Sequence, residues 1–246
     1  MKIDAGSDIG RVRETNQDYV NYIVLGENEF FCVLCDGMGG HRAGEVASSL
    51  CGEDLIKSFP KHPPFFTDAD IKAYFVEILE HANHIIKHEA NGNQAYDGMG
   101  TTAVIAYVVD ENIYISHVGD SRAYIFCNHQ LIQITEDDTL VNDLVKKGYL
   151  TANQAKNHPK KNILSQAVGV TTPLNISFHK YSGDFDALLL CSDGLYNSLN
   201  NDEIVEILEL TTNVKEKTST MLQQARMLGG YDNISVLLVE GAEVNE

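Results

Sequence analysis

The chain has 246 residues, 43% of them hydrophobic, so it can bury a large core as one domain or as two small ones, and we expect a single domain spanning residues 1–246. Its 18 basic and 35 acidic side chains give a formal net charge of -17, which argues against nucleic acid or an anionic membrane as the main partner. No apolar run approaches the roughly twenty residues that a membrane helix needs. The first residues lack the pattern of a signal peptide, so we expect a cytoplasmic protein.

Short apolar runs rich in β-branched and aromatic residues predict strands along much of the chain. In chain order they cover residues 19–25, 30–35, 102–109, 112–118, 123–126, 131–134, the run ALLLC before Asp193, and 233–239. Most connections between them are tight, such as Asp110-Glu111. Tight connections imply antiparallel neighbours, because a parallel pair needs a crossover of a dozen residues or more.

Helical periodicity lies between the second and third of these strands and again in the second half of the chain. The first two patterns are amphipathic, one with Val46, Leu50, Leu55 and Phe59, the other with Ile71, Phe75, Ile78, Ala82 and Ile85. Further helical regions are predicted at 137–168, 202–210 and 214–228. Hairpin strands with helices grouped between them indicate an α+β fold, with two sheets packed together and helices on the outer faces.

Four aspartates stand at the ends of predicted strands. Asp36, Asp120 and Asp193 each follow an apolar run, and Asp232 immediately precedes the last strand. If sheet packing brings these ends together, the carboxylates repel one another, so a positive charge must lie among them. Carboxylate oxygens without histidine or cysteine partners suit magnesium or manganese rather than zinc. The Gly37 carbonyl is a further candidate ligand, because glycine lets the backbone approach an ion.

A simpler alternative is that each aspartate caps a turn or a helix independently. Asp-Gly is common turn chemistry after a strand, and one such pair would need no other explanation. Four aspartates at strand ends, together with the sequence around them, favour a shared site.

The five cysteines are predicted to be reduced thiols. Cys32 and Cys35 have C-x-x-C spacing, but an odd separation along a strand points the two side chains to opposite faces. The sequence holds no second such pair to complete a zinc site. We therefore expect the thiols to act as small hydrophobic side chains.

Seven motifs, in order along the chain, cover nearly its whole length: SDIGRVRETNQD, CDGMGGHRAGEVAS, GMGTTAV, HVGDSRAY, NILSQAVG, LLLCSDGL and GGYDNISV. Together they resemble the metal-dependent serine/threonine protein phosphatases of type 2C, in their compact bacterial form. The resemblance implies a four-layer α-β-β-α sandwich of two mainly antiparallel sheets flanked by helices. It also implies the hydrolysis of phosphoserine and phosphothreonine in proteins.

The resemblance further implies a two-metal centre, holding Mn²⁺ or Mg²⁺, at one edge of the sandwich. Asp36 would bridge both ions, and Gly37 would offer its carbonyl to the first. Asp193 and Asp232 would hold the second ion. In bacterial members a third, weaker site uses the residues that match Asp120 and Asp193.

Two more residues have roles that the resemblance implies. Arg13 matches the phosphate-binding arginine, whose bidentate fork lysine could not reproduce. Asp18 matches the acid that orders metal-bound water. Two cations shield a dianionic phosphate ester and lower the pKa of a bridging water, which attacks in line. The implied partners are phosphorylated proteins and a cognate bacterial serine/threonine kinase, and we expect a monomer.

The sequence also departs from the family pattern. Gln17 stands where Glu is usual, so we expect weaker metal affinity. Met38 lies where eukaryotic relatives carry a histidine proposed as general acid, so the leaving group takes its proton from water or elsewhere, and His41 is expected to be structural or exposed. In the flap segment, residues 137–168, Asp138 replaces a usual His and Gln166 a usual Arg. Substrate preference is therefore the least transferable property.

Two other kinds of catalytic site, a cysteine phosphatase and a histidine metal site, do not match the residue spacing of this sequence. A cysteine phosphatase needs C-x5-R, yet six residues separate Cys35 from Arg42. His81, His84 and His88 share a helix face, but they lack HExxH and are expected to be solvated. The remaining alternative is a non-catalytic phosphoprotein-binding module on the same fold, which manganese-dependent turnover of p-nitrophenyl phosphate would separate from an enzyme.

Overall fold

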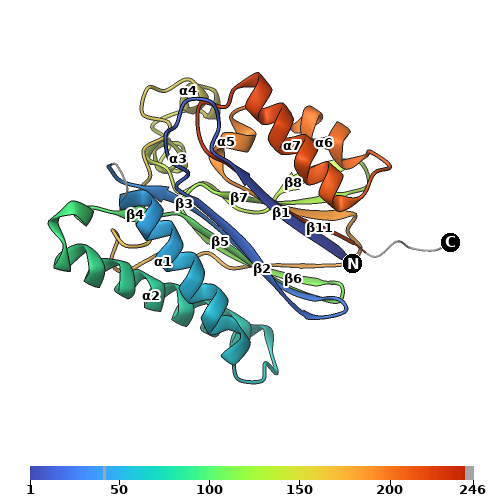
Figure 1. Ribbon diagram of the computed structural model, residues 1–246, viewed down its shortest axis with the longest axis horizontal. Coiled ribbons are helices and arrows are strands. Elements are labelled where there is room, and N and C mark those ends of the chain that lie inside the picture. Colours follow the sequence, from blue (N-terminus) through green and yellow to red (C-terminus); the bar gives the residue numbers. More distant parts are fainter. Residues whose placement is uncertain (41–42, 242–246) are drawn as a thin grey trace.

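The computed structural model describes residues 1–40 and 43–241. Two antiparallel sheets pack face to face and helices cover their outer sides, which gives four layers (Figure 1). The predicted α-β-β-α sandwich is therefore confirmed. Within the described ranges, no helix is both long enough and apolar enough to cross a membrane.

The first sheet has the strand order β1-β11-β10-β7-β8. Its strands are β1 (Lys2–Asp8), β7 (Arg122–Cys127), β8 (Gln130–Gln133), β10 (Ala187–Cys191) and β11 (Ile234–Glu240). Three helices pack on its outer face, namely α5 (Asp193–Tyr196), α6 (Asn201–Leu208) and α7 (Val214–Leu228).

The second sheet has the order β2-β3-β5-β6-β9, and β4 pairs with the end of β3. Its strands are β2 (Asp18–Gly26), β3 (Glu29–Met38), β4 (Gly100–Thr101), β5 (Ala103–Val109), β6 (Asn112–Val118) and β9 (His179–Ser182). It is covered by α1 (Ala43–Ser58) and α2 (Asp68–Gly92), with the short 3-10 helices η1 (Phe59–Lys61) and η2 (Gln94–Tyr96) beside them.

Strand alternation divides the core into layers. On β3, Cys32 and Leu34 face the opposite sheet, whereas Val33 and Cys35 face the helices. The prediction that Cys32 and Cys35 point to opposite faces is confirmed, and all five cysteines are free thiols. Because Cys35 lies in the helix-side core, a cysteine-phosphatase site at this position has no support.

Three strands lie where no apolar run predicted one: the two-residue β4, which pairs with the end of β3, and the edge strands β1 and β9. β1 (KIDAGSD) and β9 (HKYS) are polar, and both lie at the edges of their sheets. Pairing with a buried neighbour forms them: β1 matches β11 along its whole length, and β9 matches β6. An edge strand with one solvated face needs no continuous apolar run.

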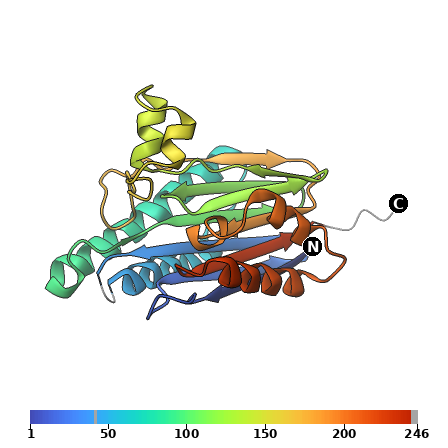
Figure 2. The same ribbon diagram turned by 90° about the horizontal axis from the view of Figure 1, so that it is seen from above.

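The predicted helical region at 137–168 is wrong in its extent. It holds two short helices, α3 (Leu140–Lys146) and α4 (Ala152–Lys156), followed by irregular chain. Gly148, with φ of 76°, ends the first, and Thr151 caps the start of the second. Both helices project beyond the sandwich (yellow-green in Figure 2). They therefore have little apolar surface of the sheets to pack against, and such packing is what stabilises longer helices.

The two amphipathic patterns are displaced slightly from the buried stripes. In α1, Val46 and Leu50 are only half-buried, and the buried positions include Ala47 and Cys51. In α2 the last buried residue is Ile86, whereas Ile85 is half-buried. The three histidines of α2 are exposed, as predicted; they are His81, His84 and His88.

Candidate metal and phosphate site

The layer between the sheets changes from apolar to polar at one end of the sandwich. Asp36 continues the face of β3 on which Leu34 packs against the opposite sheet. Asp18 lies directly across from Asp36 in the β2–β3 register. Ser192, at the end of β10, donates a hydrogen bond to Asp18 Oδ2 at 2.8 Å. Alternation therefore places two carboxylates where the sandwich ends.

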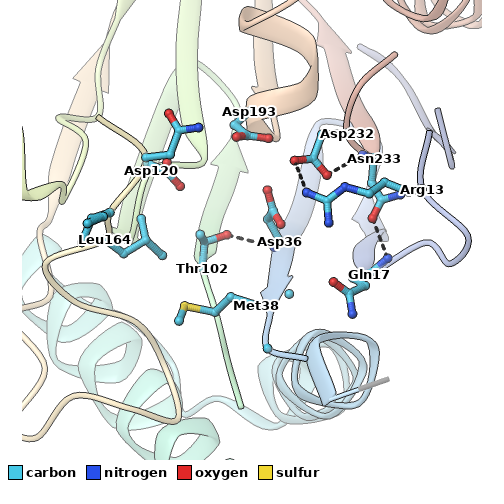
Figure 3. A pocket seen from close by; sticks show the side chains of 14 residues that line it. Arg13, Gln17, Asp36, Met38, Thr102, Asp120, Leu164, Asp193, Asp232 and Asn233 are labelled. Atoms are coloured by element: carbon cyan, nitrogen blue, oxygen red, sulfur yellow. Dashed lines mark hydrogen bonds and ion pairs between the residues drawn. The ribbon is translucent and has the colours of Figure 1, made fainter. Parts of the chain in front are cut away.

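Connections between strands place the other charged groups at the same end. Asp120 lies where the chain leaves β6 in one sheet and enters β7 in the other. Asp193 begins α5 directly after β10, and Asp232 precedes β11. Arg13 lies in the loop between β1 and β2. Figure 3 shows these side chains around one space, with the carboxylates of Asp36, Asp193 and Asp232 directed toward it.

This space is a cavity of about 460 Å³. The residues that line it include Asp36, Gly37, Asp120, Asp193 and Asp232, together with Arg13. The structure thus brings the four strand-end aspartates together, although they lie far apart in the sequence. Their individual roles stay predictions. Asp18 lies behind the cavity wall with its Oδ1 atom buried.

Burial and mutual repulsion disfavour negative charge on Asp18, Asp36, Asp120 and Asp193. Burial, and then the charges of Asp232 and Asp120, raise the pKa of Asp193 to about 8. Burial, followed by Asp18 and Asp193, raises the pKa of Asp36 well above its ordinary value. Asp120 and Asp18 each have a pKa raised to about 6, and burial is the main cause in both cases. A cation in the cavity would stabilise the charged forms.

Arg13 is the guanidinium that offsets part of this charge. Its Nη2 atom donates to Asp232 Oδ2 at 2.7 Å, and 48% of the Arg13 side chain is exposed. The arginine therefore faces the cavity from its solvent side, where it can also reach a ligand that enters from outside.

The unpaired oxygens indicate what would fit among these groups. Asp18 Oδ1 and Asp193 Oδ1 are buried and have no hydrogen-bond partner among residues 1–40 and 43–241. A buried anionic oxygen without a partner is costly, and a hard cation with oxygen ligands supplies one. Over residues 1–40 and 43–241, no group of three carboxylate, imidazole or thiol side chains is arranged to hold a metal on its own. Water and backbone carbonyls would complete each shell, as magnesium ordinarily requires.

Gly37 is packed too closely for any side chain. A Cβ atom there would lie 2.1 Å from the Gly44 carbonyl oxygen and 2.6 Å from that of Gln17. The Gly37 amide donates to the Gln17 oxygen at 3.0 Å, which holds the backbone at the cavity wall. Only glycine allows β3 to pass this close to α1 and β2.

We expect Gly37→Ala to lower the free energy of unfolding by about 3 kcal/mol, because the added methyl group overlaps two carbonyl oxygens. Gly92→Ala is the control, since a Cβ atom there meets no atom of the described residues within 4 Å apart from its chain neighbours and its own helix backbone. It should leave stability unchanged or slightly higher. Denaturant unfolding of both variants tests this, and equal stability of the two would show that β3 moves aside without cost.

Two threonines that the motif GMGTTAV contains, but to which no role was assigned, hold Asp36 in place. Thr102 Oγ1 accepts from the Asp36 amide at 2.9 Å, and Thr101 Oγ1 donates to the Asp36 carbonyl at 2.9 Å. The two hydroxyls continue the bonding to β3 just before β5 begins at Ala103. The two consecutive threonines after Gly100 are the sequence signal that could have indicated that they hold the Asp36 backbone.

Asn233 fastens the Arg13 loop to β11. Its Oδ1 accepts from the Gln17 amide at 2.9 Å, and its Nδ2 donates to the carbonyls of Ile9 and Thr15 at 3.0 Å each. One side chain next to Asp232 thus spans both ends of the loop that carries Arg13. Sequence reasoning treated this asparagine only as part of a motif.

The structure places the residues that depart from the family pattern at or next to the cavity. Gln166 Nε2 donates to Asp138 Oδ2 at 2.7 Å, so the two unusual flap residues bond to each other. Asp138 Oδ2 also accepts from the Gly119 amide at 3.0 Å, beside Asp120. Gln17 and Met38 line the cavity. The expectations for His41 and Arg42 lie outside the described residues.

The fold and the cavity together define a class of protein: an α-β-β-α sandwich with carboxylates gathered at one end. A family model described as protein phosphatase 2C matches residues 6–228. The serine/threonine phosphatase stp of Listeria monocytogenes is 37% identical over 241 residues, which cover 98% of this chain and 96% of that protein. The chain therefore belongs to the protein phosphatase 2C family, as its motifs predicted.

Solved structures agree with this assignment. The S. agalactiae serine/threonine phosphatase superposes with a TM-score of 0.92 at 35% identity, covering 98% of this chain and 99% of that one. The catalytic domain of the serine/threonine protein phosphatase PstP, solved in complex with two manganese ions, gives a TM-score of 0.80 at 31% identity and covers 97% of both chains.

Proposed function

We propose that this chain is a manganese- or magnesium-dependent phosphatase that hydrolyses phosphoserine and phosphothreonine in proteins. The observation that carries the proposal is the convergence of Asp36, Asp120, Asp193 and Asp232 on one cavity beside Arg13. Such a wall repels a phosphate dianion unless cations neutralise it. The family and the manganese complex of a relative support the same chemistry.

The proposed metal ligands are those at the cavity wall. Asp36 would contact both ions, with the Gly37 carbonyl on the first and Asp193 and Asp232 on the second. Asp120 and Asp193 would form the third, weaker site. When bound, the ions neutralise the phosphate charge and activate water for attack on phosphorus.

The remaining steps use this chain's own groups. Arg13 would exchange part of its bond to Asp232 for two phosphate oxygens, since its guanidinium fork matches their spacing. Asp18 Oδ1, buried and unpaired, would accept a hydrogen bond from water and hold it in place. Ser192 fixes Asp18 from behind through the other carboxylate oxygen.

The cellular setting is part of the proposal. Residues 1–246 would act as one catalytic unit and as a monomer in the cytoplasm, with the flap at 137–168 beside the substrate. The substrates would be phosphoproteins made by a cognate serine/threonine kinase.

Hydrolysis of p-nitrophenyl phosphate and of phosphothreonine peptides, measured against Mn²⁺ concentration, tests the proposal. We expect turnover that requires the metal and that EDTA abolishes. Binding of phosphopeptides without turnover at saturating Mn²⁺ would instead favour the non-catalytic module.

We expect Arg13→Lys to lower kcat/KM for a phosphothreonine peptide about 10- to 100-fold, because an ammonium cannot donate two parallel hydrogen bonds to phosphate. Arg11→Lys is the matched control, since Arg11 is an exposed arginine in the same loop. It should change kcat/KM less than about twofold. Equal loss in both variants would show that the loop contributes only general positive charge.

A further inference from the structure

Positive charge is concentrated in one part of this acidic molecule. The flap, residues 137–168, contains five lysines and three acidic residues, Asp137, Asp138 and Asp143, in a chain whose net charge is -17. The same segment, through Asn162, Ile163 and Leu164, lines the metal and phosphate cavity. The flap therefore adjoins the metal and phosphate cavity, and Lys161 precedes the first of these lining residues in the chain.

A second cavity, of about 670 Å³, lies under the flap. Asp120 and Asn162 line both cavities, so the two adjoin. Val141 and Ala155, on α3 and α4, give the second cavity an apolar floor. A peptide whose phosphorylated side chain lies in the first cavity can thus place a neighbouring residue in the second.

Most charges around the second cavity neutralise one another. Arg122 donates from Nε and Nη2 to both carboxylate oxygens of Asp137, at 2.8 and 2.7 Å, and its guanidinium carbon lies 3.5 Å from the centre of the Tyr196 ring. Glu136 pairs with Lys146 at 3.1 Å. The Arg122 guanidinium is therefore already paired with Asp137, and Glu136 is paired with Lys146.

Two lysines on the cavity wall are different. Lys156 and Lys161 line the cavity, both are exposed, and neither ammonium group has an ion pair or hydrogen bond with the part of the chain that the structure describes. Asp120 also faces this space, but it belongs to the metal and phosphate site. The cavity thus offers two uncompensated positive charges above an apolar floor.

We propose that this second cavity binds an aspartate or glutamate side chain of the phosphoprotein substrate, close to the phosphorylated residue, with Lys156 and Lys161 as its ligands. The inference rests on the proposed phosphatase function. An acidic neighbour would gain two charge-assisted contacts there. The site would also offset the repulsion that the overall charge imposes on acidic substrates.

The test compares two phosphothreonine peptides that differ only in carrying Glu or Gln on both sides of the phosphorylated residue. Wild type should hydrolyse the Glu peptide with about fivefold to tenfold higher kcat/KM, as expected for two partly solvated ion pairs. The ratio should fall to near one in Lys156→Gln/Lys161→Gln. Turnover of p-nitrophenyl phosphate, which has no flanking residues, should not change.

Lys147→Gln/Lys160→Gln is the matched control, because it removes the same charge from the flap at exposed positions that do not line the cavity. It should keep the preference for Glu. An equal loss of preference in both double variants would overturn the proposal, since it would indicate general steering by the flap. Absence of any preference in the wild type would overturn it as well.

Fluorescence anisotropy with the same two peptides gives the comparison without turnover. If wild type binds the Glu peptide more tightly and the cavity variant does not, the proposal holds even where hydrolysis is absent. Missing hydrolysis at saturating Mn²⁺ would then count against the phosphatase function alone.

Discussion

Asp36→Asn protein should lose at least about 1,000-fold in kcat/KM for p-nitrophenyl phosphate, because it removes the carboxylate proposed to contact both ions. In EDTA the same variant should unfold about 5 °C higher than wild type. Burial and the charges of Asp18 and Asp193 raise the pKa of Asp36, so a neutral amide relieves an unfavourable charge. Activity assays and thermal unfolding with and without Mn²⁺ measure both effects.

The opposite directions of these two effects distinguish a metal ligand from a structural residue. The amide and carbonyl of Asp36 bond to Thr102 and Thr101, and the substitution leaves those bonds in place. Asp202→Asn, at an exposed position in the first turn of α6, is the control and should change neither property appreciably. An Asp36→Asn variant that is inactive and less stable in EDTA would contradict the account.

Metal-free protein should become less stable as the pH rises from 4 to 8. Burial and neighbouring aspartates raise the pKa of Asp193 to about 8, from an ordinary 3.8, so the folded state keeps a proton that the unfolded chain has lost. Stability falls with pH wherever the folded state binds more protons. Asp120 and Asp18, each with a pKa of about 6, add to the fall between pH 4 and 6. The total should reach several kcal/mol.

Manganese should reverse this dependence, because the ligands must be deprotonated to bind and the metal stabilises only the folded state. Urea unfolding from pH 4.5 to 8.5, in EDTA and in saturating Mn²⁺, measures both profiles. Asp193→Asn should flatten the upper part of the EDTA profile. A flat profile in wild type, or a manganese effect that is the same at every pH, would contradict the account.

The fold could be predicted largely from local patterns. Apolar runs separated by tight connections predicted most strands, and alternation along β3 correctly placed Cys32 and Cys35 on opposite faces. The edge strand β1 was missed, and the helical region at 137–168 was predicted too long, because a distant partner forms the first and caps limit the helices of the second. Local propensity cannot report a partner more than two hundred residues away.

The residue types of the site could be read from the order of amino acids along the chain. Four aspartates at strand ends, an arginine in the first loop and seven ordered motifs were enough to predict the chemistry and the family. The glycine after Asp36 was also visible, but not that two carbonyl oxygens exclude a Cβ atom at that position. Composition and order along the chain carry this information, since they set which groups are available and on which face of a strand they lie.

Which of these groups lie close together became clear from the folded structure. It showed that the chain crosses between sheets at Asp120 and that Arg13 bonds Asp232. Within the described part of the chain, Asp18 and Asp193 each keep one buried oxygen without a partner. The structure also separated Lys156, which lines the second cavity, from Lys160, which does not line that cavity. Distances between segments depend on how the two sheets pack, and that packing is a property of the whole core rather than of any local pattern.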